Sequence, residues 1–195
     1  MATISRGCNV SLSVPVSQGD IFRHVKYSYI DKEMDNNVQV IEYEFPYAVV
    51  ISQACDVISM EKMLTEHKGK VTKFMPSILM CPIYDKENAK NGSHLVDAFT
   101  ELGIEKDNES LFSSKEYNIV QKDWHYRFHD LTVNRGNENI IENHVIDFKN
   151  YFTVPLSYLV CNKSDRIVHL DDIFAEQITL KFATFLTRVA IPDDK

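Results

Sequence analysis

The stretch AVVISQACDV, residues 48–57, decides the fold that this chain is predicted to adopt. Its first half, from Ala48 to Ile51, is a continuous apolar run, which is typical of a strand buried on both faces. The polar or reactive side chains that follow at once are Ser52, Gln53, Cys55 and Asp56. Loops at strand ends hold reactive groups on a rigid scaffold, so this tip is either a candidate site or only the exit of a strand.

The segments that flank this strand predict more of the sheet. Residues 19–30 and 38–45 alternate apolar and polar side chains on either side of a polar turn, which predicts a long hairpin that ends at Pro46. Residues 77–84 form another apolar run, in which Pro82 indicates a strand at an edge or one that ends early. These runs place much of the predicted sheet in the first half of the chain.

Two later segments add strands to this prediction. Residues 124–133 alternate, so that aromatic side chains face one way and His125, Arg127 and His129 face the other. Residues 143–160 predict one or two further strands, broken at a proline.

Two helices are predicted from capping residues and periodicity. Residues 56–69 suit a helix that begins at Asp56 and is capped by Gly69. Residues 171–190 repeat apolar side chains at three- and four-residue steps, which indicates an amphipathic helix of about five turns. An aspartate at its start, Asp171 or the residue after it, is the predicted cap.

The predicted fold class is α+β: a small bent antiparallel sheet or SH3-like barrel, with a helical insertion and a long C-terminal amphipathic helix. We expect a single domain over residues 1–195, with a barrel core at about 18–84 and 124–160. The polar stretch at about 85–121 is the predicted insertion, with one short helix near residues 93–102.

Composition and charge limit the class of partner. The chain has 195 residues and a net charge of −7. Nucleic-acid binders usually carry a basic surface, because phosphate contacts supply much of their affinity. The acidity therefore argues against a broad nucleic-acid surface but leaves room for a small basic groove. No apolar run approaches the roughly 20 residues of a membrane helix, and no secretory signal is recognisable, so we expect a cytoplasmic protein without a membrane partner.

The cysteines do not predict a disulfide framework or a metal centre. Cys8, Cys55, Cys81 and Cys161 include no C-x-x-C pair, and in a reducing cytosol we expect free thiols. Cys55, Cys81 and His129 could together form a zinc site, but closely spaced ligand pairs are missing, so we expect no metal. The chain has no Walker loop, no G-x-G-x-x-G and no G-x-S-x-G motif, and we expect no cofactor.

The strand tip is the first of three constellations that could carry chemistry. A cysteine at the start of a helix has a lowered pKa, because the first-turn N–H groups favour the thiolate. Asp56 would oppose that shift in Cys55. The alternative is that Asp56 only caps the helix and Cys55 only fills space.

The other two constellations are basic. On a strand, His125, Arg127 and His129 would line one face about 7 Å apart, a row that could hold a phosphate, with Arg127 as the cation and a histidine as general acid or base. The alternative is an ordinary solvated strand face. The cluster of Arg23, His24 and Lys26 could likewise contact phosphate near a barrel mouth or simply occupy polar positions on the hairpin.

The order of three motifs resembles a known family. QGDIF (18–22), FPYAVVIS (45–52) and ILMCPIY (78–84) resemble the PemK/MazF-like proteins, which are toxin endoribonucleases of toxin–antitoxin systems with small SH3-like barrels that usually form dimers. The resemblance implies a structural turn at Gly19 and Asp20 and a strand-end polar group at Ser52. The chain departs from the family pattern in lacking an Arg before Pro46 and a catalytic Thr or Ser after Pro82.

The first functional hypothesis is a metal-independent endoribonuclease that acts as a toxin or antiviral defence effector. RNA cleavage needs a base, an acid and a cation near one phosphate. The predicted catalytic residues are His129 as base or acid, Arg127 as the cation, and Cys55 or Asp56 as a positioning group. The predicted substrate-binding residues are Ser52, Gln53, His125 and Arg23.

The second hypothesis is a non-catalytic protein–protein interaction subunit that uses the same barrel. Its partner would be an antitoxin or a subunit of a defence complex, and a homodimer is compatible with both hypotheses. Binding surfaces need apolar anchors more than titratable groups. The aromatic residues proposed to supply them, or to pack the core instead, are Tyr43, Phe45, Tyr47, Tyr151, Phe152 and Tyr158.

Overall fold

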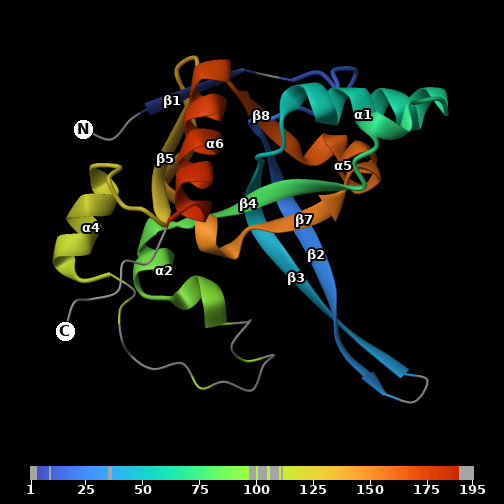
Figure 1. Ribbon diagram of the computed structural model, residues 1–195. Helices are drawn as coiled ribbons and strands as arrows, with labels where there is room; N and C mark the ends of the chain where they lie inside the picture. Colours follow the sequence, from blue (N-terminus) through green and yellow to red (C-terminus); the bar gives the residue numbers. More distant parts are fainter. Residues whose placement is uncertain are drawn as a thin grey trace.

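The computed structural model describes residues 4–8, 10–34, 37–96, 100, 105, 110 and 112–188. Over these residues the fold is mixed α+β: an eight-stranded sheet bends into a ring, with helices around it (Figure 1). The strands are β1 (Ile4–Cys8), β2 (Asp20–Met34), β3 (Asn37–Val50), β4 (Ser77–Asp85), β5 (Phe128–Arg135), β6 (Glu138–Asp147), β7 (Phe152–Pro155) and β8 (Arg166–Leu170). The helices are α1 (Ala54–Glu66), α2 (Lys86–Lys90), α4 (Ser114–Gln121), α5 (Leu156–Cys161) and α6 (Asp172–Leu186).

The ring closes because β3 has a neighbour on each side. The hydrogen-bonded order is β3-β2-β8-β1-β5-β6-β4-β7, and β4 also pairs with β3. The β1–β5 pair is parallel and the other pairs are antiparallel, which confirms the mainly antiparallel sheet. The β3–β4 seam is short, running from Tyr47 opposite Ile83 to Val50 opposite Met80, so the ring is not a regular barrel.

The apolar run of residues 48–51 is buried on both faces, as predicted. Val49 and Ile51 belong to a core cluster that includes residues of most strands and of α6. Ala48 and Val50 belong to a second cluster, which α1 and α5 cover. Because successive side chains of a strand point to opposite faces, one short run at the end of β3 joins two cores.

The hairpin of β2 and β3 is confirmed, but Pro46 does not end it. β3 continues through Pro46 to Val50, because the proline lies where β3 passes from the projecting arm into the closed ring. Beside it, His24 adopts a left-handed conformation with φ 54°, and the strand register passes from the Arg23–Tyr47 pair to the Val25–Phe45 pair. Figure 1 shows the distal arm projecting away from the body.

The prediction that Pro82 marks an edge or an early end is wrong. β4 is an interior strand that pairs with β3 on one side and with two different strands on the other. On that other side, β7 pairs as far as Met80 and β6 begins at Ile83. Pro82 therefore lies at the gap between the two partners, where a missing N–H interrupts no ladder on that side.

The helix at the strand tip begins earlier and ends earlier than predicted. Gln53, not Asp56, is the N-cap of α1, and Asp56 lies in the first turn. The helix ends at Glu66, and its C-cap is His67, which takes the left-handed conformation (φ 51°) expected of Gly69 as the predicted cap. Gly69 instead packs against Met63, where a Cβ would clash with the side chain.

The last third of the chain differs from its prediction in two places. Residues 156–161 form α5 and not a strand, because the buried Leu156 and Leu159 lie three residues apart and share one helix face in the second core. α6 has Asp171 as its N-cap, as predicted, but ends at Leu186 and is shorter than expected. No helix in the described part of the chain is long and apolar enough to cross a membrane.

The predicted insertion contains more structure than one short helix. Directly after β4, Asp85 caps α2 by accepting hydrogen bonds from the N–H groups of Glu87 and Asn88. α4 follows later, with a reciprocal capping box between Ser113 and Glu116. Where a helix was predicted near residues 93–102, the structure has a short 3-10 turn, η2 (Ser93–Leu95), and residues 97–99 and 101–102 lie outside the described residues.

A buried ionic network anchors the start of β2. The Arg166 guanidinium donates to the Asp20 carboxylate at 3.0 Å and to the backbone carbonyls of Ser11, Val14 and Pro15 at 2.8–3.0 Å. Asp20 also accepts from the Ser17 N–H. The loop before β2 is therefore fixed by side chains and not by a ladder, and the Gly19–Asp20 turn serves a structural purpose.

We expect Asp20→Asn to lower the free energy of unfolding by about 3 kcal/mol, because it leaves the Arg166 charge buried without a counter-ion. Urea unfolding followed by circular dichroism measures this. The control is Asp165→Asn, which removes only an exposed contact with Arg23 and should cost less than about 1 kcal/mol. Equal losses in the two variants would contradict the assignment.

The Asp20 carboxylate also makes the stability of the fold depend on pH, through its hydrogen bond with His169. A hydrogen bond with Asp20 raises the pKa of His169 against the opposing effect of burial. A raised folded-state pKa stabilises the fold below the unfolded value of about 6.5, and this contribution fades as the pH rises through the folded value. The unfolding free-energy difference between wild type and His169→Asn should therefore shrink from about pH 5.5 to about pH 9. A constant difference across this range would contradict it.

Candidate functional site

The residues of the strand tip face structural partners. Ser52 accepts a hydrogen bond from the Leu79 N–H at 2.9 Å and ties the end of β3 to β4. Asp56 lies 3.7 Å from the Lys73 ammonium in an exposed ion pair. Gln53 is the exposed N-cap of α1, and Cys55 is an exposed thiol in its first turn.

The predicted row of His125, Arg127 and His129 is not one strand face. β5 begins only at Phe128, and residues 124–127 form a bend before it. Within that bend, His125 Nδ1 accepts from the N–H groups of Arg127 and Phe128 at 3.1 and 3.2 Å. Burial lowers the pKa of His125, which favours the neutral ring that these hydrogen bonds require.

Arg127 is held by the most buried carboxylate nearby. Its guanidinium donates two hydrogen bonds to Asp147, at 2.7 and 2.6 Å. Burial opposes ionisation of Asp147, but the hydrogen bonds from Arg127 and its neighbours outweigh it and lower the pKa of the carboxyl. Arg127 is therefore paired inside the protein, where it holds the end of β6.

His129 lies inside a second ionic cluster. The residue is only 4% exposed, and its Nδ1 lies 2.8 Å from the Asp123 carboxylate. Lys181 of α6 pairs with the same carboxylate. Burial opposes ionisation of Asp123, yet its bonds with His129 and Lys181 lower its pKa. The cluster fastens α6 to the segment before β5.

The two halves of the predicted catalytic constellation are not brought together. Ser52 follows β3 and contacts β4 near Leu79, whereas His129 lies on β5. β6 separates β5 from β4, so the two sites are about two strand spacings apart across the sheet, or about 10 Å, and further apart along β4. Arg23, the remaining predicted residue, lies on the hairpin and contacts Asp165.

The structure assembles no metal centre in the part of the chain that it describes. No three histidine, cysteine, aspartate or glutamate side chains there lie close enough to hold an ion. Of the ligands once considered, Cys55 is exposed on α1, while Cys81 is buried in β4 at the ring seam. Burial raises the pKa of the Cys81 thiol, which disfavours the thiolate that zinc binds.

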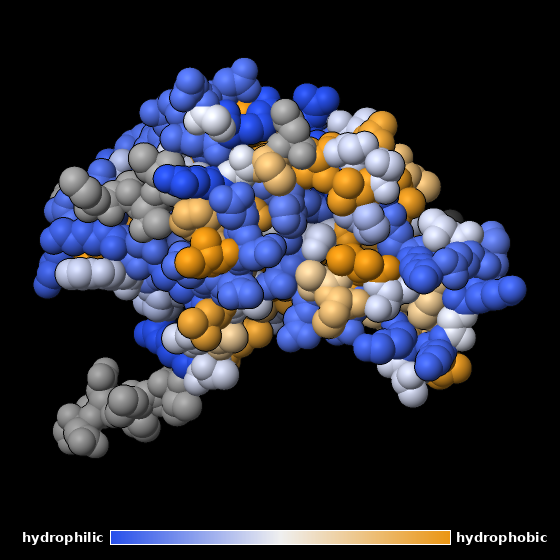
Figure 2. All heavy atoms as spheres, turned by 90° about the horizontal axis from the view of Figure 1, so that it is seen from above, coloured by the Kyte–Doolittle hydropathy of each residue, from blue (hydrophilic) through white to orange (hydrophobic). Residues whose placement is uncertain are grey.

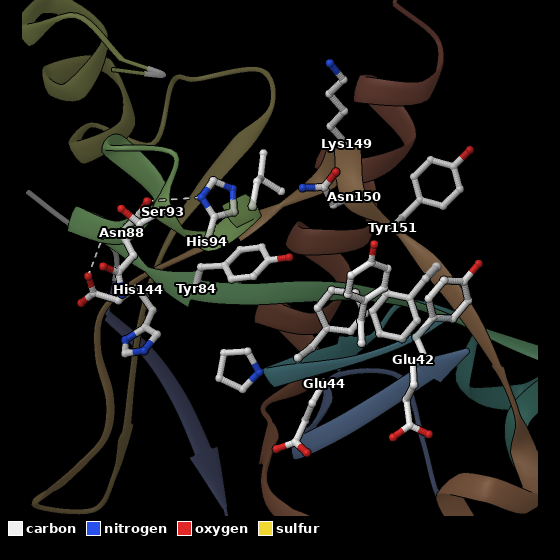
Figure 3. Close-up of a pocket in the computed structure, with 17 residues that line it drawn as sticks. Glu42, Glu44, Tyr84, Asn88, Ser93, His94, His144, Lys149, Asn150 and Tyr151 are labelled. Atoms are coloured by element: carbon white, nitrogen blue, oxygen red, sulfur yellow. Dashed lines mark hydrogen bonds between the residues drawn. The ribbon is translucent and has the colours of Figure 1, made fainter. Parts of the chain in front are cut away.

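Among the described residues, a cleft of about 790 Å³ lies at the base of the hairpin. Its walls come from the hairpin, from the end of β4 with α2, and from the segment that joins β6 to β7. Figure 3 shows Lys149, Asn150 and Tyr151 on one side of it and Glu42 and Glu44 on the other.

Aromatic side chains line much of the cleft, and several of them form a continuous stripe. The aromatic residues that line it are Tyr27, Tyr43, Phe45, Tyr84, Tyr151 and Phe152. Phe45 stacks on Phe152 with 4.4 Å between ring centroids, and Tyr27 packs against both rings. From Tyr27 the stripe continues along the hairpin through Tyr29 to Tyr43. Four of these residues are among the anchors that the interaction hypothesis predicted.

The floor of the cleft is polar and buried. The side chain of His94 is 1% exposed, and its Nδ1 donates to the Asn88 carbonyl at 3.3 Å. Its Nε2 makes no hydrogen bond with any described residue and lies 3.7 Å from the Asp147 carboxylate. The His94 ring packs on Tyr84 with centroids 4.5 Å apart (Figure 3), and burial raises the pKa of Tyr84.

The rim of the cleft carries both signs of charge. Glu42 pairs with Lys26 at 3.1 Å and Glu44 with His24 at 2.8 Å, all on the hairpin. Lys149 is exposed on the opposite side. The exposed pairs contribute little stability, so these charges are available to orient a ligand.

Sequence reasoning missed the cleft as a site. It singled out the strand tip and the His-Arg-His row, and it did not name Tyr84, His94 or Asn150. The one signal was the density of aromatic residues around positions 43–47 and 151–158.

Comparison of the chain with models of protein families, with curated proteins and with solved structures finds no match. The PemK/MazF-like resemblance therefore stays a prediction.

We expect Asp147→Asn to destabilise the protein by about 3 kcal/mol at neutral pH, because Arg127 then loses its buried counter-charge. The matched control is Glu142→Gln, an exposed position on the same strand, which should cost less than about 0.5 kcal/mol. Chemical unfolding of the two variants measures both values. A loss for Asp147→Asn no larger than the control's would show that the pair does not hold the cleft wall.

Proposed function

We propose that the chain is a protein-binding module whose aromatic cleft takes an extended segment of a partner polypeptide. The observation that carries the proposal is the cleft of about 790 Å³ with its six aromatic lining residues. Aromatic side chains bury a large apolar area at a low entropic cost, and they dominate binding hot spots. The proposed partner is an antitoxin or a subunit of a defence complex.

The edge of β3 beside the cleft supports binding of an extended segment. Among the described strands, β2 is the one strand partner of residues 38–42, 44 and 45 of β3, and pairing with β4 starts at Tyr47. Unpaired strand edges are templates for the addition of a further strand. A partner strand here would gain backbone hydrogen bonds from β3 and place alternate side chains against the aromatic stripe.

The alternative, RNA cleavage, receives less support from the geometry. It needs a base, an acid and a cation around one phosphate, whereas His129 is buried and Arg127 is paired with Asp147. We also propose that the sheet is related to an SH3-like barrel, and the bent antiparallel run of β2, β3 and β4 supports this.

Selection from a displayed library of random peptides tests the proposal. The full chain should enrich peptides, and fluorescence anisotropy should show that Tyr43→Ser and Tyr151→Ser each weaken the best of them by about 10-fold, the loss expected when an interface aromatic is truncated. The control is Tyr126→Ser, an exposed tyrosine outside the cleft. N-methylation of alternate peptide nitrogens should abolish binding if a strand is added.

Two outcomes would contradict the proposal. One is enrichment of no peptide, or of peptides that bind all three tyrosine variants like wild type. The other is cleavage of RNA by the purified chain in EDTA that His129→Ala abolishes, which would select the ribonuclease.

A further inference from the structure

A basic segment stands out in this acidic protein. Residues 62–74 contain four lysines and one glutamate, a formal charge of +3, while the whole chain carries −7. The segment covers the end of α1 and the turn that follows it. No residue of the segment lines the aromatic cleft.

The lysines of this segment are exposed and weakly engaged. Lys68 and Lys70 form no ion pair with any other residue that the structure describes. Lys62 and Lys73 make only long contacts, 3.7 Å to Glu66 and 3.7 Å to Asp56. In Figure 2 the end of the molecule that carries α1 is dominated by hydrophilic residues with small hydrophobic spots.

Two apolar side chains stand among these lysines. Val71 is 92% exposed and Phe74 is 60% exposed. A short 3-10 turn, η1 (Val71–Lys73), sets their positions: the Lys73 N–H donates to the Lys70 carbonyl at 2.9 Å and the Phe74 N–H to the Val71 carbonyl at 3.1 Å. The turn thus presents two apolar side chains and several positive charges together.

We propose that residues 62–74 bind the surface of an anionic lipid membrane. Lysine ammonium groups would contact the negatively charged headgroups, and Val71 and Phe74 would enter the interface between headgroups and acyl chains. Juxtaposed basic and apolar side chains are what such a surface binds. This peripheral contact requires no membrane-spanning helix, and it revises the expectation of no membrane partner.

A nucleic acid is the alternative anionic partner, but the exposed Val71 and Phe74 side chains favour a lipid surface. Single-stranded nucleic acids stack their bases on flat rings, which Phe74 could offer. Val71 has no ring to stack on, although it is the more exposed of the two. A lipid interface accommodates both side chains.

Co-sedimentation with vesicles tests the proposal on the full chain. The chain should pellet with phosphatidylcholine vesicles that contain phosphatidylserine and stay in solution with phosphatidylcholine alone. The double variant Lys68→Gln/Lys70→Gln should weaken binding by about 30-fold, since each lysine near an anionic surface contributes roughly fivefold. The charge-matched control Lys115→Gln/Lys122→Gln, at exposed positions elsewhere, should bind like wild type.

A second variant separates the apolar contribution. Val71→Ser/Phe74→Ser should weaken vesicle binding at high salt as well as at low salt, because burial of apolar surface is not screened. Circular dichroism confirms that each variant is folded. Binding to a fluorescent single-stranded oligouridylate without binding to vesicles would overturn the proposal, and so would binding to neither, or equal binding to both kinds of vesicle.

Discussion

The burial of residues 48–51 on both faces is the constraint on which the rest of this structure depends. One strand supplies alternate side chains to two cores and pairs with β2 and β4 at the same time. A slip of one residue would exchange the two sets of side chains, so the register is strongly specified. With that register fixed, the distal hairpin must leave the body at Pro46, and its aromatic side becomes a wall of the cleft.

Two buried carboxylate–guanidinium pairs hold the irregular segments around this ring. Asp20 with Arg166 fixes the loop before β2, and Asp147 with Arg127 fixes the turn between β6 and β7. In each case the guanidinium or the carboxylate also bonds to nearby backbone groups. Charged residues that look catalytic in the sequence, such as Arg127, are used here to hold backbone that has no ladder partner.

The parts of the fold that could be predicted are those with a local pattern. The hairpin, β4, the helix after residue 53 and the start of α6 each carry periodicity or capping residues. β1 and β8 are five-residue strands, too short to show a period. Residues 124–127 alternate like a strand yet form a bend, because hydrogen bonds to the His125 ring replace a ladder. The cleft could not be predicted, since its walls come from segments far apart in the sequence that only the ring closure brings together.

The positions of the cysteines allow separation of β3 from β4 to be detected by thiol labelling. Cys8, Cys55 and Cys161 are exposed, whereas Cys81 lies opposite Val49 at the seam where β3 meets β4. A thiol-specific reagent would label the outer three at once and reach the fourth only in molecules whose seam has parted. The rate at which Cys81 is labelled would therefore measure how often the pairing of β3 with β4 opens.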